Sequence, residues 1–532
     1  YLNLKSFFSN MFYLLLLENT LQNQNCSDGV DAAVLADLSA VIHRVDRRFL
    51  SVTIDASLAS EEKFMYLLSS PKIRTLAGAL SPAFVRFGGT RQDFMVFVPR
   101  RPGPGSGEAA EPSCAELDLP SWLEEKLKAD WTQQKLILLR EDLQRKYRRV
   151  KFTESTVDLL HSFSSCSGMD LIFGLNALLR TADNTWNSSN ARSLLQYCES
   201  KQYRMSWELG NEPNSYEKKA GIRVDGYQLG QDFTRLREMM SESKLYRDAG
   251  LFGPDVGQPR DHRVDILEGV MILIRCVHVL SSASYYVNGR DTSLEDFLDP
   301  EVLDTLALKT GEVLQKVQLA SPGKPVWLGE TSSAYGGGAV GLSDTFVAGF
   351  MWLDKLGLAA RLGLDVVMRQ VFIGSGSYHL VDDNLDPLPD YWLSVLYKRL
   401  VGPEVLKVEA SPSVARSKRV RLYLHCANRN RYGSGAVTLM AMNLSKKPAR
   451  ISIHALVSSG TVEAFVLESE QPGEDGLYSR SVRLNGVVLK MLDDKTLPDL
   501  NGLRLPPSEH LQLPAYSLAF FVLTDARAAG CE

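Results

Sequence analysis

Two glutamates that follow short apolar runs are the first candidates for chemistry. Glu212 lies in "MSWELGNEP", where an apolar run breaks into Gly-Asn-Glu-Pro, and Glu330 lies near the end of "PVWLGET". A single glutamate at a strand end is more often a helix cap or a surface ion pair than a catalytic group. Two that meet are the minimum for glycoside hydrolysis, because one protonates the leaving oxygen while the other attacks the anomeric carbon or activates a water. The pair therefore predicts a glycosidase.

Eight short runs of β-branched and aromatic residues must position these carboxylates, and segments with helical periodicity separate most of them. The runs cover residues 51–55, 83–89, 170–176, 205–212, 251–256, 283–289, 325–331 and 366–372. This alternation predicts an α/β fold, a (β/α)8 TIM barrel, with a doubly wound sheet as the alternative. Reacting groups of a barrel lie at the C-terminal ends of its strands, so Glu212 and Glu330 would converge over one mouth.

Two segments depart from the alternation. The stretch "RRPGPGSGEAAEPS" is rich in Pro, Gly and Ser and predicts a disordered link. It is followed by a charged amphipathic helix that ends in the basic run "RKYRRVK". After about residue 400, short alternating strands are separated by turn residues, which predicts a C-terminal β-sandwich domain.

Length, composition, net charge and cysteine count narrow the class of protein. With 532 residues, 45% of them hydrophobic, the chain has room for two or three domains with a large core. A formal net charge of -4 argues against a nucleic-acid partner, and seven cysteines without a CxxC pair predict neither a zinc site nor a redox motif. N-x-S sequons at Asn25, Asn187 and Asn443 are compatible with secretion, and residues 1–30 are expected to be signal-like or disordered.

Longer motifs identify a family. The chain contains "WELGNEPNS", "GPDVGQPR", "YYVNGR", "VWLGETSSAYGGG" and "YHLVDDNLDPLPDYWLS". Together these motifs resemble the heparanase family of glycoside hydrolases, from about residue 30 to the C-terminus. The resemblance implies a barrel with a β-sandwich domain and a retaining endo-β-glucuronidase that hydrolyses the heparan sulfate chains of proteoglycans. It also implies that the protein needs no metal and no organic cofactor.

The resemblance gives each carboxylate a role. Glu212 would be the acid/base and Glu330 the nucleophile, with the two carboxyl groups about 5–5.5 Å apart, as a retaining reaction requires. Glu212 must hold its proton until the leaving oxygen takes it, which suits an acidic compartment. Asn211 would hydrogen-bond the sugar 2-OH, and Tyr285 would orient the nucleophile.

A sulfated substrate requires cations along the cleft. The residues that the resemblance assigns to substrate binding are Asp55, Thr90, Asn211, Lys218, Lys219, Arg260, Tyr285, Arg290, Tyr335, Gly336, Gly337, Gly338, Gln370 and Tyr378. The backbone amides of the three glycines and the Tyr378 side chain would hold a uronate. A heparin-binding run is expected at Arg145, Lys146, Arg148, Arg149 and Lys151. Any one of these cations, taken alone, could equally be a solvated surface charge.

The chain also departs from the family pattern. Ser57 stands where Asn is usual, and the basic run after "VGQPR" is reduced to "DHR". Where the family has Trp-His-His-Tyr-Tyr, this chain has "LSSASYY", so Ala283 and Ser284 replace two histidines near the nucleophile. The alternative is therefore a catalytically impaired paralogue that binds heparan sulfate. An exo-acting β-glucuronidase is a weaker rival, because it would need a closed pocket.

The resemblance further implies secretion to the extracellular matrix and lysosomes, with processing by a lysosomal cysteine protease. The protease would remove residues 102–144, a linker. A small chain, residues 31–101, would contribute one sandwich strand and the first barrel strands. It would stay paired as a heterodimer with a large chain that holds the rest of the barrel, residues 145–400, and the sandwich, residues 401–532.

The cysteine pairing also follows from the resemblance, which implies bridges Cys114–Cys166 and Cys426–Cys531 and leaves Cys198 as a thiol. The second bridge would close a loop of about a hundred residues, worth about 4–5 kcal/mol in the chain-entropy model. Cys276 is expected to be a thiol as well.

Overall fold

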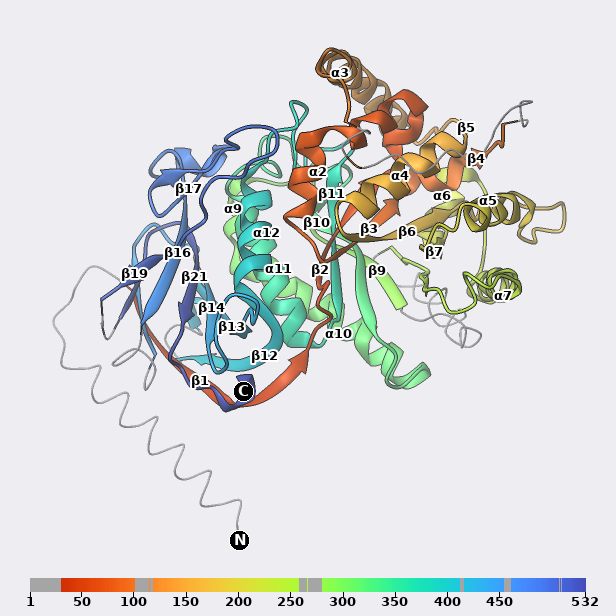
Figure 1. The fold of residues 1–532 in the computed structure, drawn as a ribbon. Helices are drawn as coiled ribbons and strands as arrows, with labels where there is room; N and C mark the ends of the chain where they lie inside the picture. Colours follow the sequence, from red (N-terminus) through yellow and green to blue (C-terminus); the bar gives the residue numbers. More distant parts are fainter. Residues whose placement is uncertain are drawn as a thin grey trace, which may run out of the picture.

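The fold consists of a parallel barrel and a β domain packed against its side (Figure 1). The computed structural model describes residues 30–100, 114, 118–257, 266, 280–411, 416–453, 461–506, 508 and 510–532. The expected N-terminal segment before residue 30, most of the Pro/Gly link, Arg260 and Cys276 lie outside the described residues.

Eight parallel strands form the barrel in the order β8-β7-β6-β3-β2-β11-β10-β9. They are β2 Leu50–Asp55, β3 Ala83–Gly88, β6 Met169–Leu175, β7 Ser206–Leu209, β8 Leu251–Phe252, β9 Leu280–Asn288, β10 Val326–Tyr335 and β11 Val366–Ile373. A parallel bridge between Val256 and Ser282 joins the two edges and closes the ring. The predicted (β/α)8 barrel is confirmed, although the fifth predicted run forms regular strand at only two residues.

The barrel interior is apolar at its base and polar toward its mouth. Phe84 and Phe252 pack on Trp327 at the base, with ring centroids 4.9 and 4.7 Å from that of the tryptophan. Side chains two residues apart on a strand share a face, so Phe84 and Arg86 both point inward. Arg86 therefore lies one layer above the aromatic cluster, where it contacts Glu330.

Helices surround the strands and connect them (Figure 1). They are α2 Pro71–Gly78, α4 Glu154–Cys166, α5 Ser189–Ser200, α6 Tyr216–Ala220, α7 Gly226–Glu242, α9 Leu294–Leu298, α10 Pro300–Ala320, α11 Ala348–Leu362 and α12 Pro389–Leu400. Short 3-10 helices follow several strands, namely η1 Ala56–Ser60, η2 Glu62–Ser69, η3 Thr90–Phe94 and η4 Pro213–Ser215. A small two-stranded sheet pairs β4 Met95–Phe97 with β5 Val150–Phe152.

The predicted linker helix is present as α3 Ser121–Gln144, at the top of Figure 1. Trp131 packs on Phe64 at 5.1 Å between ring centroids, and Gln134 donates a hydrogen bond to Ser60 at 3.0 Å. Lys135 forms an ion pair with Asp383 at 2.8 Å. These partners belong to the segments that follow β2 and β11, so α3 lies at the end of the barrel where these two strands end.

The β domain is one continuous sheet around a shared apolar core, and the first strand of the chain, β1, lies inside it between β12 and β15. Its order is β18-β17-β16-β21-β14-β13-β12-β1-β15-β20, with β19 paired to β16. The strands are β1 Val30–Arg44, β12 Val401–Ala410, β13 Val420–Ala427, β14 Val437–Asn443, β15 Ala449–Ile453, β16 Val462–Ser469, β17 Val482–Leu484, β18 Val487–Val488, β19 Leu503–Leu505, β20 Leu511–Leu513 and β21 Ser517–Leu523. The predicted C-terminal β-sandwich is confirmed, and β1 completes it before the chain enters the barrel at β2.

Helix α11 lies between the barrel and the β domain (Figure 1) and joins them closely. A Cβ atom at Gly357 would lie 2.1 Å from the Tyr423 ring, so only glycine allows this approach. One turn earlier, Asp354 accepts a hydrogen bond from the Arg421 Nε at 2.6 Å and another from the Tyr423 hydroxyl. These contacts fix the outer helices of the barrel against the sandwich.

Both expected disulfides are present, Cys114–Cys166 and Cys426–Cys531, and Cys198 is a buried thiol. The second bridge spans 105 residues of sequence and ties the C-terminus to β13. None of the described helices combines the length and apolar character that crossing a membrane requires.

The sequons differ in accessibility. Asn443 is fully buried, and its side-chain amide donates to the carbonyls of Lys447 at 2.8 Å and Pro514 at 2.9 Å, so it cannot carry a glycan in this fold. Asn187 is exposed, and its side-chain oxygen accepts a hydrogen bond from the Ser189 hydroxyl at 2.7 Å.

Candidate active site

The loop after β7 has the backbone that places Glu212. Gly210 has a φ of 74°, and a Cβ atom there would lie 2.1 Å from the Tyr216 hydroxyl oxygen, so this position requires glycine. Glu212 itself has a left-handed backbone, with a φ of 49°, which is uncommon for a residue with a side chain. Its N–H donates to the Asp255 carbonyl at 3.1 Å, while the Asn211 N–H donates to Asp93 at 2.8 Å. The strained turn is therefore fixed from both sides.

The Glu212 carboxylate faces a lysine and remains partly open. Lys219 Nζ lies 2.7 Å from Glu212 Oε2 and donates to the Thr90 hydroxyl at 3.0 Å. The Glu212 side chain is 27% exposed. Burial lowers the pKa of Lys219, but the Glu212 carboxylate outweighs it and the net pKa is raised. Lys219, expected on substrate, thus pairs with the carboxylate expected to act as acid/base.

Glu330 is held more rigidly. The Tyr285 hydroxyl donates to Glu330 Oε1 at 2.8 Å, and Arg86 Nη1 donates to Oε2 at 3.1 Å. Both carboxyl oxygens are therefore occupied and the side chain has one orientation. Burial raises the pKa of Glu330 above its usual value, and the Glu212 charge adds to this effect, while Arg86 and Tyr285 oppose it.

Arg86 connects four strands in a buried polar network. Its guanidinium forms a bidentate pair with Glu208 at 2.8 and 2.7 Å, donates to Asn211 Oδ1 at 2.7 Å, and lies 3.1 Å from Asp255 Oδ2. Burial raises the pKa of Asp255 well above its usual value, and the neighbouring carboxylates add to this shift against Arg86. One arginine therefore faces three carboxyl groups, Glu208, Asp255 and Glu330.

Sequence reasoning missed Arg86, Glu208 and Asp255. The available signal was an arginine inside the apolar run "AFVRFGG", where a charge must have a buried partner. The partner could not be named, because Arg86 and Glu208 are 122 residues apart in sequence.

Asn211 retains one unpaired donor. Its side-chain oxygen accepts the hydrogen bond from Arg86, while its Nδ2 is buried and has no partner among the described residues. A buried amide N–H without a partner is unfavourable. This donor suits the sugar hydroxyl that Asn211 was expected to bind.

Another side of the mouth carries Asp55, Gln370 and Tyr378. Gln370 donates to Asp55 Oδ2 at 2.8 Å, and the Ser57 N–H donates to Asp55 Oδ1 at 2.8 Å. The Tyr378 ring stacks on Tyr285, with centroids 6.3 Å apart. Tyr378 is thereby linked to the residue that holds Glu330.

The glycine loop after β10 lies against the same segment. Gly336, Gly337 and Gly338 have φ values of 82°, 96° and 85°, a run that favours glycine at each position. The Ser377 N–H donates to the Gly337 carbonyl at 2.6 Å. Tyr335, just before the glycines, is 43% exposed at the rim.

The remaining predicted cations are at the surface. Lys218 is exposed in α6, and Arg290 is exposed two residues after β9. The heparin-binding run is exposed as well, namely Arg145, Lys146, Arg148, Arg149 and Lys151. Arg148 Nε pairs with Glu141 of the linker helix at 3.2 Å.

The altered segment before Tyr285 still forms a barrel strand. Ala283 pairs with Glu330 and Ser284 with Thr331 in the parallel register of β9 and β10. Ala283 packs with Tyr285 in a small buried cluster close to the nucleophile. The strand geometry is therefore kept, although both histidine side chains of the family pattern are absent.

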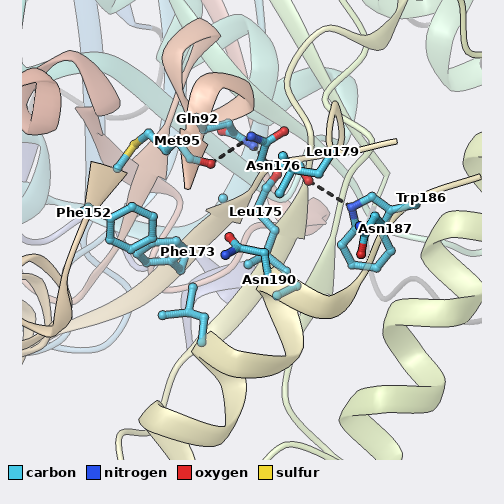
Figure 2. A pocket seen from close by; sticks show the side chains of 13 residues that line it. Gln92, Met95, Phe152, Phe173, Leu175, Asn176, Leu179, Trp186, Asn187 and Asn190 are labelled. Atoms are coloured by element: carbon cyan, nitrogen blue, oxygen red, sulfur yellow. Dashed lines mark hydrogen bonds between the residues drawn. The ribbon is translucent and has the colours of Figure 1, made fainter. Parts of the chain in front are cut away.

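A cavity beside the barrel lies apart from both carboxylates (Figure 2). It is lined in part by Met95, Asn176 and Trp186; Asn176 Nδ2 donates to the Met95 carbonyl at 2.8 Å, and Trp186 Nε1 donates to the Asn176 carbonyl at 2.9 Å. Neither Glu212 nor Glu330 lines it. This cavity is therefore separate from the candidate site at the barrel mouth.

Several known proteins are similar to this chain in sequence or in fold. The sequence profile of the glycosyl hydrolase family 79 N-terminal domain matches residues 146–357. Heparanase of Mus musculus is 49% identical over 500 residues, which cover 92% of this chain and 92% of that protein. The chain belongs to the heparanase family, and it is a glycoside hydrolase with the N-terminal domain of glycosyl hydrolase family 79. Inactive heparanase-2 of Homo sapiens is 37% identical over 533 residues, covering 94% of this chain and 90% of that protein.

A solved structure agrees on the fold. A 4-O-α-L-rhamnosyl-β-D-glucuronidase from Fusarium oxysporum superposes with a TM-score of 0.57 at 14% identity, covering 92% of this chain and all of that one. At that identity the likeness concerns the architecture alone, a barrel with an attached β domain.

Proposed function

We propose that the protein is a retaining endo-β-glucuronidase that hydrolyses the heparan sulfate chains of proteoglycans. The observation that carries the proposal is the pair of Glu212, which follows β7, and Glu330, which lies within β10, joined through Asp255 and Arg86. Support also comes from the heparanases of Mus musculus and Gallus gallus, both 49% identical to this chain.

In the proposed reaction, Glu330 attacks the anomeric carbon while Glu212 gives its proton to the leaving oxygen. Tyr285 and Arg86 hold Glu330 in line and stabilise its charged form. Glu212 then removes a proton from a water, which hydrolyses the glycosyl-enzyme ester. The partial exposure of Glu212 gives the leaving group and the water access to the same carboxyl.

The rim supports a long anionic substrate. Lys218, Arg290 and the cationic run 145–151 are exposed around the mouth, where they could pair with sulfate and carboxylate groups over several sugar units. The substrate should therefore extend past the site in both directions, which favours internal cleavage.

Sizing the products tests the proposal. Heparan sulfate would be incubated with the linker-excised protein at mildly acidic pH, with a Glu330→Gln variant as the control. Fragments of intermediate length are expected from the wild type and none from the variant. Release of single sugars would instead indicate an exo-acting enzyme, and unchanged chains that still bind the protein would indicate a binder.

The second candidate is a heparan-sulfate-binding protein without catalysis. Ala283 beside Glu330 favours it, because the site lacks an imidazole that the family pattern provides there. Retention of Glu330, with its Tyr285 and Arg86 contacts, favours the enzyme.

We further propose that the protein is secreted, reaches the extracellular matrix and lysosomes, and is made latent. Helix α3 crosses the segments after β2 and β11, which supports occlusion of the mouth by residues 102–144. A lysosomal cysteine protease would cut near Leu143, which is apolar and 56% exposed, and leave Arg145 as a new N-terminus. The two chains would remain a heterodimer, because strands β1 to β4 stay paired with the large chain.

Blocking the cut tests this latency. The variant Leu143→Asp with Gln144→Asp should stay uncut in lysosomal extract and should cleave heparan sulfate at least about tenfold more slowly than the processed wild type. Leu319→Asp, at an exposed position in α10, is the control and should be processed normally. Full activity of the uncut variant would show that the linker is only a surface insertion.

A further inference from the structure

Arg91 is a buried cation at the mouth whose hydrogen-bonded and ion-paired partners all belong to the linker helix. Within the described residues, its guanidinium contacts the Leu138 carbonyl at 2.9 Å, Glu141 at 3.4 Å and Asp142 at 3.0 Å. These partners lie in the last two turns of α3, inside the segment proposed to be excised. The Arg91 side chain is only 7% exposed. The uncut chain therefore keeps this cation paired and away from solvent.

Arg91 lies next to residues expected to hold substrate. It follows Thr90, whose hydroxyl binds Lys219, the partner of Glu212. Its charge also interacts with Asp55 at the end of β2. Because β2 and β3 both end at the mouth of the barrel, Arg91 belongs to the wall of the cleft.

One contact of Arg91 would survive excision. The guanidinium carbon lies 5.3 Å from the centroid of the Tyr147 ring, and that ring packs on Phe94 at 5.0 Å. Neither aromatic residue belongs to residues 102–144. Stacking on an aromatic face would keep the guanidinium in place while its N–H donors lose their acceptors. A guanidinium freed in this way is available to a new anionic partner.

We propose that Arg91 is a substrate-binding residue of the excised enzyme, and that Glu141 and Asp142 occupy its guanidinium in the uncut chain where an acidic group of the polysaccharide binds afterwards. That group is a carboxylate or a sulfate, since both accept paired hydrogen bonds from arginine. Glu141 also pairs with Arg148, so two linker carboxylates mask two cations. The inference rests on the proposed function. It adds a second cause of latency to the steric cover by α3, namely the pairing of substrate-binding cations with carboxylates of the linker.

The experiment compares uncut and excised forms of one full chain that carries site-specific protease sites at both ends of the linker. Binding of a labelled heparin octasaccharide would be measured in a Glu330→Gln background, so that no cleavage occurs. Arg91→Gln should weaken binding about tenfold in the excised form and less than twofold in the uncut form. Carboxyl-reduced and desulfated octasaccharides identify the group that Arg91 binds. Arg91→Gln should not weaken the binding of the octasaccharide from which this group has been removed.

A matched control is Arg235→Gln, which removes an exposed arginine that pairs with Glu238 on α7. It should change affinity less than twofold in both forms. In the active background, Arg91→Gln should raise KM about tenfold and leave kcat within twofold, because binding to a ground-state anion is lost equally in the transition state.

A second variant covers the case in which Arg91→Gln does not fold. Glu141→Gln with Asp142→Asn keeps Arg91 and should raise the affinity of the uncut chain several-fold. An excised Arg91→Gln protein with unchanged affinity, or an uncut double variant with unchanged affinity, would show that Arg91 only fastens the linker. If the octasaccharide binds as expected but the wild type cuts no heparan sulfate, the proposed hydrolysis fails and this inference stands.

Discussion

The two candidate carboxylates, Glu212 after β7 and Glu330 within β10, are held in opposite ways. Glu212 follows its strand on a strained turn, is partly open, and faces the flexible side chain of Lys219. Glu330 lies inside its strand, is nearly buried, and is clamped by Arg86 and Tyr285. A group that moves protons must reach both the leaving oxygen and water, whereas a nucleophile must keep one orientation. The difference between the two carboxylates matches this division of work.

Removing each carboxyl in turn has the largest expected effect. Glu330→Gln should lower kcat by about 10⁴-fold or more on every substrate, because no other group can form the ester. Glu212→Gln should cost about 10²–10⁴-fold on heparan sulfate but much less on an aryl glucuronide, whose leaving group needs no proton. The measurement is kcat/KM for both substrates, because this ratio reports the first step, whereas kcat also depends on the second step, in which Glu212 acts as base on either substrate. An equal loss on both substrates for Glu212→Gln would contradict the assigned roles.

Tyr285→Phe tests the clamp on the nucleophile. The lost hydrogen bond stabilises the Glu330 carboxylate, so the pKa of Glu330 should rise further and the acidic limb of the kcat/KM profile should move to higher pH. Activity should therefore fall more at pH 5 than at pH 7. The control is Tyr286→Phe, on the same strand, whose hydroxyl binds Asp354 and not Glu330. If kcat/KM fell by the same factor at every pH and the acidic limb did not move, Tyr285 would not control the pKa of Glu330.

Asp255→Asn has the smallest expected effect. It tests whether the buried carboxyl group of Asp255, in the network around Glu330, stabilises or destabilises the fold. The folded pKa of Asp255 is raised above its unfolded value, mainly by burial. A carboxyl group with a raised pKa stabilises the fold in its protonated form. The contribution of Asp255 to the free energy of unfolding is therefore lost as pH rises from the unfolded pKa of about 3.9 toward the pKa in the folded state. The variant should therefore unfold at a higher urea concentration than the wild type at pH 7 and at the same concentration near pH 3.

Urea unfolding at both pH values measures this gain, with Asp248→Asn at an exposed position as the control. A destabilised Asp255→Asn protein at pH 7 would mean that Arg86 needs the Asp255 charge. The carboxylates around Glu330 would then be stabilised by Arg86, as the Glu212 carboxylate is by Lys219.

Local patterns predicted much of the fold. Periodicity located all eight barrel strands, and the change of pattern near residue 400 falls where α12 ends at Leu400 and β12 begins at Val401. Composition separated the link from the helix that became α3. These features depend on neighbours in sequence, so the sequence alone is enough to show them. The weakest prediction was the fifth strand, where regular pairing stops after Phe252 and resumes only at Val256.

The sequence by itself determined that Glu212 and Glu330 end up at one mouth, because strand position decides which end of a barrel a residue occupies. The tertiary structure alone decided their surroundings: Arg86 reaches Glu330 across 244 residues of sequence. It also decided that α3 packs on the segments that follow β2, β3 and β11 and that Arg91 pairs with Asp142. The physical reason is that a buried charge takes whichever partner the closed barrel brings within hydrogen-bonding distance, and no local pattern records that partner.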